Sequence, residues 1–363
     1  MLFELSSLLL LSVIMAHMIP ATLIRRLRGM ELPPPEKPNA SPAAADDDGQ
    51  DAYKPTPIDI VVTRIMLTRS KRLPLDLVDS VFDFAEYWAH SASVIHYPSE
   101  QHDHLHIRGG GPQENSFMLR SLPLGLTAIH GDENLAEDLA YDSTEAKPLP
   151  LLEEHDGVFF ARLANYPTPR LIHPCRKIVF SLKSHDQGWG GDPEYKGTYE
   201  SSWTWFEAGL ERFDAKQNCD DKCTYDVRRD SPSSAPPRLP VCGLRPVYPS
   251  IEQGESDEYQ YVHPILPQEQ WVIQRNKTAS RDWQDHLVTW SYADDIEAES
   301  DVGMEPDEHG RGLDEQGRGR GTGDGSFVRS LKMGDVVTVW GKARFPAWVN
   351  HVEYVKVEVY WAV

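Results

Sequence analysis

Cysteine is scarce in this sequence, whose 363 residues contain only four, at Cys175, Cys219, Cys223 and Cys242. A zinc site usually shows two close cysteine pairs, or one pair with spaced histidines. Here Cys219 and Cys223 form one close pair and no second pair follows it. We interpret all four as reduced, with a structural metal or a disulfide as alternatives. Reduced cysteines are typical of a cytoplasmic or nuclear protein.

Several enzyme motifs are missing as well. The sequence contains no Gly-x-Ser-x-Gly nucleophile elbow, no phosphate-binding glycine loop and no paired-histidine metalloprotease helix. The glycine-rich tract at 310–325 does not follow a strand and open a helix, which excludes a Rossmann loop. We therefore predict no catalytic residue and no cofactor. A hydrolase acting on a sugar or a small molecule is the alternative.

Basic residues are outnumbered, since 36 Lys and Arg stand against 56 Asp and Glu, for a net charge of −20. An acidic surface repels a phosphate backbone, so nucleic acid is not an expected partner. Aromatic residues, in contrast, are plentiful, with ten Trp, fourteen Tyr and eleven Phe. They are sufficient for the core of one large or two modest domains.

The N-terminus divides into an apolar segment, 1–30, and a linker, 31–57. The apolar run 5–24 has about the length that crosses a bilayer, and the arginines that follow it would keep the rest of the chain on the cytoplasmic side. The alternatives are a mispredicted start and a loose apolar helix. Proline and acidic residues in the linker favour disorder. The main domain is therefore expected in the cytoplasm or nucleus, or anchored to a membrane from the cytoplasmic side.

The clearest fold signal lies at the C-terminus, where Val355, Val357, Val359, Trp361 and Val363 occupy every second position. This alternation predicts a strand with one buried face. β-Branched residues at 335–343 predict the strand before it. Further strands are predicted near 116–120, 177–183, 202–206, 271–276 and 286–292. Together they indicate a mainly β protein, an antiparallel, jelly-roll-like β-sandwich over 115–363 with flexible insertions at 214–268 and 294–325.

Residues 73–90 form a predicted amphipathic helix, with Leu77, Val81, Phe84 and Trp88 on one stripe. Its opening resembles the first helix of an F-box at Leu73, Pro74, Asp76, Leu77, Val78 and Val81, which is less than half of that motif. The resemblance implies that Leu73, Pro74 and Leu77 contact a ubiquitin-ligase adaptor, within an F-box-like region of helix and loops at 58–114. A plain packing helix is the alternative.

Histidines recur at every second position in His102, His104 and His106. A strand would place their three imidazoles on one face, where three can hold a metal. The glycines at 109–111 favour a loop leading into a strand instead, so no metal site is predicted here.

Two loops of the predicted sandwich carry the candidate ligand site: Asp186, Gln187 and Trp189 in one, and Trp348 and Asn350 in the other. Binding residues concentrate on loops held by a rigid scaffold. An exposed Trp offers a flat apolar face and one donor, which suits a sugar ring or a peptide side chain. Alternatively, the two Trp close the ends of the core, while Asp186 and Asn350 bond their own turns.

Several blocks of the sequence resemble a group of uncharacterised fungal proteins, at 184–190, 199–206, 286–295, 334–340, 345–350 and 357–360. The resemblance implies no particular activity. A looser analogy is to F-box proteins whose second domain is a jelly-roll sandwich that binds a glycoprotein or another substrate. The sequence therefore predicts a non-enzymatic recognition protein, an F-box-like receptor that binds a protein or glycan through its sandwich loops. A membrane-tethered interaction protein is the further alternative.

Overall fold

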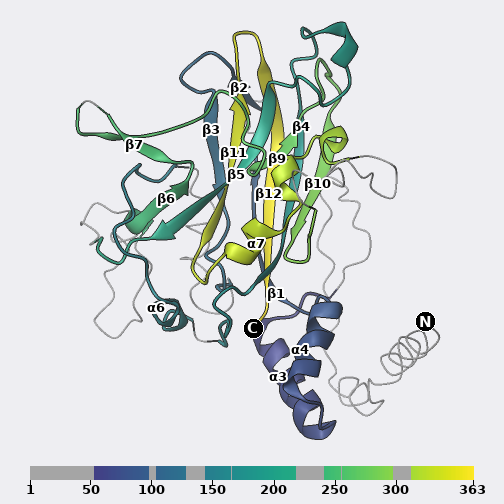
Figure 1. The fold of residues 1–363 in the computed structure, drawn as a ribbon, viewed down its shortest axis with the longest axis vertical. Helices are drawn as coiled ribbons and strands as arrows, with labels where there is room; N and C mark the ends of the chain where they lie inside the picture. The colour runs from purple at the N-terminus through teal and green to yellow at the C-terminus, as the bar shows by residue number, and fades with distance from the viewer. Residues whose placement is uncertain are drawn as a thin grey trace, which may run out of the picture. The chain divides into compact units, whose positions relative to one another are not determined.

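The computed structural model describes residues 53–97, 104–127, 144–164, 166–217, 241–254, 256–296 and 312–363. Two antiparallel sheets pack face to face as a sandwich, which confirms the predicted fold (Figure 1). The first sheet contains β1 (Ala89–His96), β2 (Leu105–Arg108), β4 (Cys175–His185), β10 (Gln284–Ser291) and β12 (Val349–Trp361). The second contains β3 (Asn115–Arg120), β5 (Thr204–Phe213), β6 (Leu244–Tyr248), β9 (Val272–Arg275) and β11 (Val336–Ala343).

The strand order explains how distant segments meet. The first sheet runs β1-β12-β4-β10, with β2 also paired to β12, and the second runs β3-β11-β5-β6, with β9 also paired to β5. The chain changes sheets at each step from β2 to β5 and again from β9 to β12. The first and last strands, β1 and β12, are neighbours in the first sheet. A separate hairpin, β7 (Ile251–Gln253) and β8 (Tyr259–Tyr261), completes the strands that the structure describes.

The predicted C-terminal strand is confirmed as the centre of the first sheet. β12 pairs along one edge with β1 and β2 and along the other with β4. The five apolar residues of its predicted buried face are all at most 4% exposed. They pack in the sandwich core with large side chains from both sheets, among them Phe180, Trp290, Phe206 and Val339.

The sandwich begins earlier than the sequence predicted, which is a correction to the boundary at 115. Ala89 on β1 is opposite Trp361, and Ile107 on β2 is opposite Asn350. The predicted F-box-like region 58–114 therefore contains two strands of the sandwich. Its polar and histidine-rich composition concealed them, because β1 and β2 lie at a sheet edge and share only one partner strand.

Two helices precede β1 and lie beside the end of β12 (Figure 1). α3 (Pro57–Ser70) begins with a capping box between Thr56 and Asp59, and α4 (Leu75–Phe84) follows a short turn. The predicted helix 73–90 is thus too long, since Ala85 and Glu86 turn the chain and Glu86 has a positive φ of 49°. Trp88 lies beyond this turn and cannot continue a helical stripe.

The buried face of α4 also differs from the prediction. Val78 and Phe82 are buried against the sandwich, whereas Leu77 and Phe84 are 54% and 80% exposed. The periodicity of this helix allows two stripes one residue apart, and only the position of the sheet selects between them.

Both predicted insertions are narrower than expected. The segment 214–268 contains β6, β7 and β8, and Leu244 and Tyr248 of β6 are buried. The segment 294–325 contains the 3₁₀ turns Asp314–Gln316 and Arg320–Thr322, and Leu313 is buried. Pro246 made β6 resemble a loop, but an edge strand tolerates proline. Residues 218–240 and 297–311 lie outside the described residues.

Short helices fill the remaining connections: α6 (Gly157–Ala161), α7 (Ser326–Ser330) and the 3₁₀ turns Pro193–Tyr195 and Val241–Gly243. Within the described ranges, no helix has the length and apolar character needed to cross a bilayer. The apolar run 5–24 lies outside them.

The prediction of four reduced cysteines is wrong for Cys242, which is disulfide-bonded. Cys175 is a free thiol in the core, and burial raises its pKa to about 12. Cys219 and Cys223 lie outside the described residues. Spacing along the chain could not reveal this bond, because a disulfide depends on which loops the fold brings together.

Candidate functional site

The two loops predicted to carry the ligand site do meet at one end of the sandwich. The side-chain oxygen of Gln187 accepts from the backbone N–H of Val349 at 3.1 Å, and its amide nitrogen donates to the carbonyl of Trp189 at 2.7 Å. Asp186, Gln187 and Asn350, however, are all buried. These three polar residues therefore hold the loops together from within.

Asp186 shows this role in detail. One carboxylate oxygen accepts from the backbone N–H of Gln187 at 2.6 Å, and the other from that of Ala279 at 2.7 Å. Burial raises the pKa of Asp186 to about 7, while the two N–H donors act in the opposite direction. Because both oxygens are engaged, the carboxylate positions the backbone of this loop.

Asn350 forms a comparable buried frame. Its amide nitrogen donates to the carbonyls of Trp205 and Lys342, each at 3.3 Å, and its oxygen accepts from Asn276 at 2.9 Å. The predicted alternative, in which Asp186 and Asn350 bond their own turns, fits only the bond from Gln187 to Asp186. The other bonds of both side chains reach distant segments.

The two tryptophans differ from each other. Trp189 is 54% exposed, although Gln187 fixes its carbonyl. Trp348 is half-buried, and a Cβ atom added at Gly191 would be in van der Waals contact with its ring edge. Among the five predicted residues, Trp189 is therefore the side chain available to a ligand.

The same loop continues into an open cleft of about 600 Å³. Ligand sites typically enclose about 300–1,000 Å³, so the cleft has the volume of a small-molecule or oligosaccharide site. It is lined by residues from three segments: Tyr195, Tyr199, Glu200, Ser201, Glu269, Arg275, Asp314 and Arg320.

Charges in the cleft are paired. Glu269 forms an ion pair with Arg275 and accepts from the backbone N–H of Arg320 at 3.1 Å. Asp314 forms an ion pair with Arg320. Glu200 is the third carboxylate of the lining, so three carboxylates face two guanidinium groups and the net charge of the lining is −1. Tyr195 and Tyr199 are half-buried and contribute aromatic surface.

Sequence reasoning missed this cleft for an identifiable reason. Tyr195 and Tyr199 follow Trp189 in a loop that was correctly placed between two strands. The other lining residues include Glu269, Asp314 and Arg320. The sequence predicted flexible insertions at 214–268 and 294–325, so these three positions lay inside an insertion or next to one. The two tyrosines in a polar loop were the available signal.

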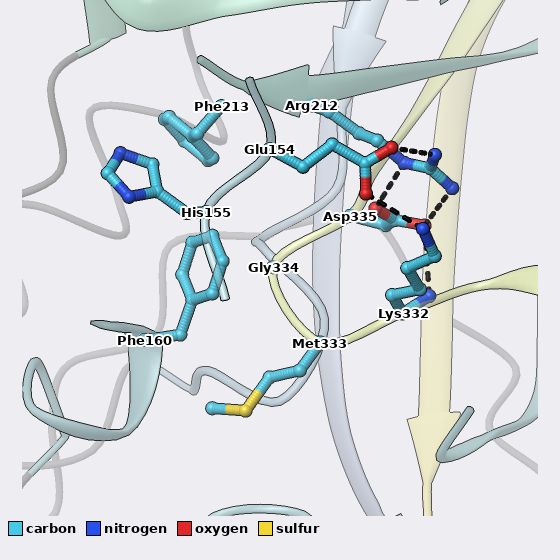
Figure 2. A pocket seen from close by; sticks show the side chains of 9 residues that line it. All are labelled: Glu154, His155, Phe160, Arg212, Phe213, Lys332, Met333, Gly334 and Asp335. Atoms are coloured by element: carbon cyan, nitrogen blue, oxygen red, sulfur yellow. Dashed lines mark hydrogen bonds and ion pairs between the residues drawn. The ribbon is translucent and has the colours of Figure 1, made fainter. Parts of the chain in front are cut away.

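A second concavity, shown in Figure 2, is too small for a ligand. Its volume is about 20 Å³, which suits a single water molecule. Arg212 pairs with Glu154 and Asp335, both at 2.8 Å, and Lys332 pairs with Glu154 at 2.7 Å (Figure 2). This network fastens the segment before β11 to β5, which is a structural role.

Lys342 on β11 is a buried titratable group of another kind. Burial lowers its pKa to about 8, a property that can mark a nucleophile. Its ammonium donates to Asn115 at 3.2 Å, lies 2.6 Å from the ring nitrogen of His263 and faces Glu207 at 3.6 Å. Because its side chain is 1% exposed, we interpret it as part of a buried polar layer.

The helices present a separate surface. Leu73 is half-buried, whereas Pro74 and Leu77 are exposed. Further apolar side chains of both helices are 45–80% exposed, and we call this set the hairpin face: Ile58, Val62, Ile65, Met66, Leu75, Leu77 and Phe84. Large apolar side chains that two neighbouring helices leave exposed can mark an interaction site.

Comparisons with protein-family models, curated proteins and solved structures found no match. Function is therefore inferred from the cleft, from Trp189 and from the hairpin face.

Proposed function

We propose that this protein is a non-enzymatic recognition protein that binds a neutral glycan in the cleft lined by Tyr195 and Tyr199. The single observation that carries the proposal is the cleft itself, with about 600 Å³ of open volume and two half-buried tyrosines in its lining. Aromatic faces suit the apolar faces of sugar rings, and fixed polar groups suit their hydroxyls.

The electrostatics favour a neutral ligand. An anionic ligand would need an excess of basic groups, but Arg275 and Arg320 are each paired with a carboxylate. The chain as a whole also carries a net charge of −20, which repels anions. A peptide is the competing ligand class, and hydrolysis of the bound sugar is the competing activity.

Binding of the full-length protein to an array of neutral, sialylated and sulfated glycans tests the proposal. We expect binding to neutral glycans, weakened at least tenfold by Tyr195→Ala. Because Tyr195 is half-buried and lies outside the buried core, its truncation should shift the melting temperature by less than about 3 °C. Tyr259→Ala in β8 is the matched control and should bind normally.

Three results would contradict the proposal: no glycan bound, a preference for anionic glycans, or unchanged binding after Tyr195→Ala. Release of a shortened sugar from a bound oligosaccharide would favour the hydrolase instead.

A second surface supports the receptor role. We propose that the hairpin face binds the adaptor subunit of a ubiquitin ligase, as the F-box resemblance implies. The observation that favours it is the exposure of Leu77 and Phe84 on α4, which the sandwich leaves uncovered. A packing helix would bury its large apolar side chains, and α4 buries Val78 and Phe82 only.

Gel filtration of the full-length protein with a purified adaptor tests this second proposal. The wild type should co-elute with the adaptor, and the double variant Leu77→Asp, Phe84→Asp should not, because charge in an apolar interface is costly. Leu287→Asp is the control, since Leu287 is 74% exposed on β10 and belongs to neither helix. If the wild type elutes apart from the adaptor, the hairpin face has another role.

A further inference from the structure

Four histidines gather at the end of the first sheet, where β12 begins. His351 on β12 is directly opposite His106 of β2 on one side and His185 of β4 on the other. Side chains of directly opposed residues share a face, with their Cβ atoms about 4.5–5.5 Å apart. The strand register therefore builds a row of three imidazoles, and His104, which precedes β2, adds a fourth.

The ring nitrogens are close enough to share one ligand. Nε2 of His104 lies 2.8 Å from Nδ1 of His351 and 2.7 Å from Nε2 of His106. The rings of His185 and His351 are stacked, with centroids 4.4 Å apart. One nitrogen from each of His104, His185 and His351 lies within 4.8 Å of the other two.

His185 forms the kind of hydrogen bond that orients the ring of a metal-binding histidine. Its Nδ1 lies 2.5 Å from the carbonyl oxygen of Asp186, so this nitrogen carries the proton and donates. Nε2 is then left with its lone pair. A ligand histidine typically donates its second nitrogen to a carbonyl or carboxylate in this way, which fixes ring and tautomer. The buried carboxylate of Asp186 fixes that backbone in turn.

The contacts around His104 also favour a bound cation. A ring nitrogen holds either one proton or one lone pair, so Nε2 of His104 cannot form two strong hydrogen bonds, to His106 and to His351. A cation can instead accept a lone pair from each ring. Two nitrogens on a tetrahedral zinc ion are about 3.3 Å apart, because Zn–N bonds are about 2.0–2.1 Å. Ligation thus requires the rings to separate by about half an ångström.

We propose that His104, His185 and His351 bind one divalent cation of the late first-row transition metals, such as Zn²⁺. Imidazole ligands suit these metals, whereas Mg²⁺ and Ca²⁺ require oxygen ligands. Three protein ligands leave a fourth position for water or for His106, which is exposed beside them. This site goes beyond the proposed glycan recognition and does not depend on it.

Trp283 lies close enough to the histidines for its fluorescence to report metal binding. Its ring packs edge-on against His185, with centroids 4.4 Å apart, and against His104 at 5.2 Å. Binding of Co²⁺ or Cu²⁺ at the three histidines should therefore quench its fluorescence, and Trp283→Phe should remove that part of the quenching.

Calorimetric titration of the chelator-treated full-length protein with Zn²⁺ is the deciding experiment, with Mg²⁺ and Ca²⁺ as negative controls. We expect one Zn²⁺ per chain, at least 100-fold weaker binding after His351→Gln and equally weak binding after His104→Gln. The second variant lies before β2, so it tests the site even if His351→Gln fails to fold. His96→Gln, an exposed histidine on β1, should bind as the wild type does. Absence of stoichiometric binding, or equal affinity of His104→Gln and His96→Gln, would overturn the proposal.

Discussion

Deletion of residues 354–363 is expected to leave a chain that does not fold. These residues form most of β12, which pairs with β1 along one edge and with β4 along the other. Their loss would open the first sheet in its middle and expose the core faces of both neighbours. Burial of one large apolar side chain contributes about 1.5–3 kcal/mol. Five such side chains therefore account for about as much as the whole 5–15 kcal/mol stability of a domain.

The measurement is the soluble yield and the thermal unfolding of the deleted protein beside the full chain. Point variants separate loss of burial from loss of pairing. Val357→Asp places a charge at a fully buried position, whereas Lys356→Ala changes its neighbour on the opposite face. We expect Val357→Asp to behave like the deletion and Lys356→Ala like the wild type. A deleted chain that melts at the wild-type temperature would show that β12 is dispensable.

The strands were predictable because their signal is local. Val355 to Val363 alternate with polar residues, and this period of two specifies both the strand and its buried face. The helix α4 was harder, because Leu77 and Val78 begin two competing stripes. Only packing in the folded protein decides which stripe is buried. The core that covers Val78 also contains residues of other elements, such as Ile60 on α3.

The candidate sites were also difficult to predict, because their residues come from segments that lie far apart in the sequence. The loop position of Trp189 was predicted, with an exposed Trp and a Trp that closes the core as the two alternatives. The cleft was not predicted, since Glu269 and Arg320 come from distant segments that only the fold brings near Tyr199. The histidine cluster is similar. The spacing of His104 and His106 was visible, but His185 and His351 join them through strand register, which a sequence does not display.

Replacement of Glu211 by alanine is expected to be the most damaging single loss of a charge in the described part of the chain. Glu211 on β5 accepts from Nε of Arg120 at 2.5 Å and from Nη2 at 3.2 Å. Each side chain of this pair is only 2% exposed. The guanidinium also lies over the ring of Phe117, with its central carbon 4.4 Å from the ring centroid. Arg120 is thus held inside the protein, away from water.

Removing one partner of such a pair leaves a buried charge without its carboxylate, at a cost of about 3–5 kcal/mol. Glu153→Ala is the matched control, because Glu153 pairs with Lys216 at 3.3 Å while both side chains are more than half exposed. An exposed pair contributes about 0–1 kcal/mol. Urea denaturation of both variants measures the two losses directly. The double variant Arg120→Met, Glu211→Leu should recover much of the stability, because it removes both charges and keeps the volume. If Glu211→Ala and Glu153→Ala lose the same free energy of unfolding, the buried pair contributes no more than a surface one, and other contacts hold β3 and β5 to β11.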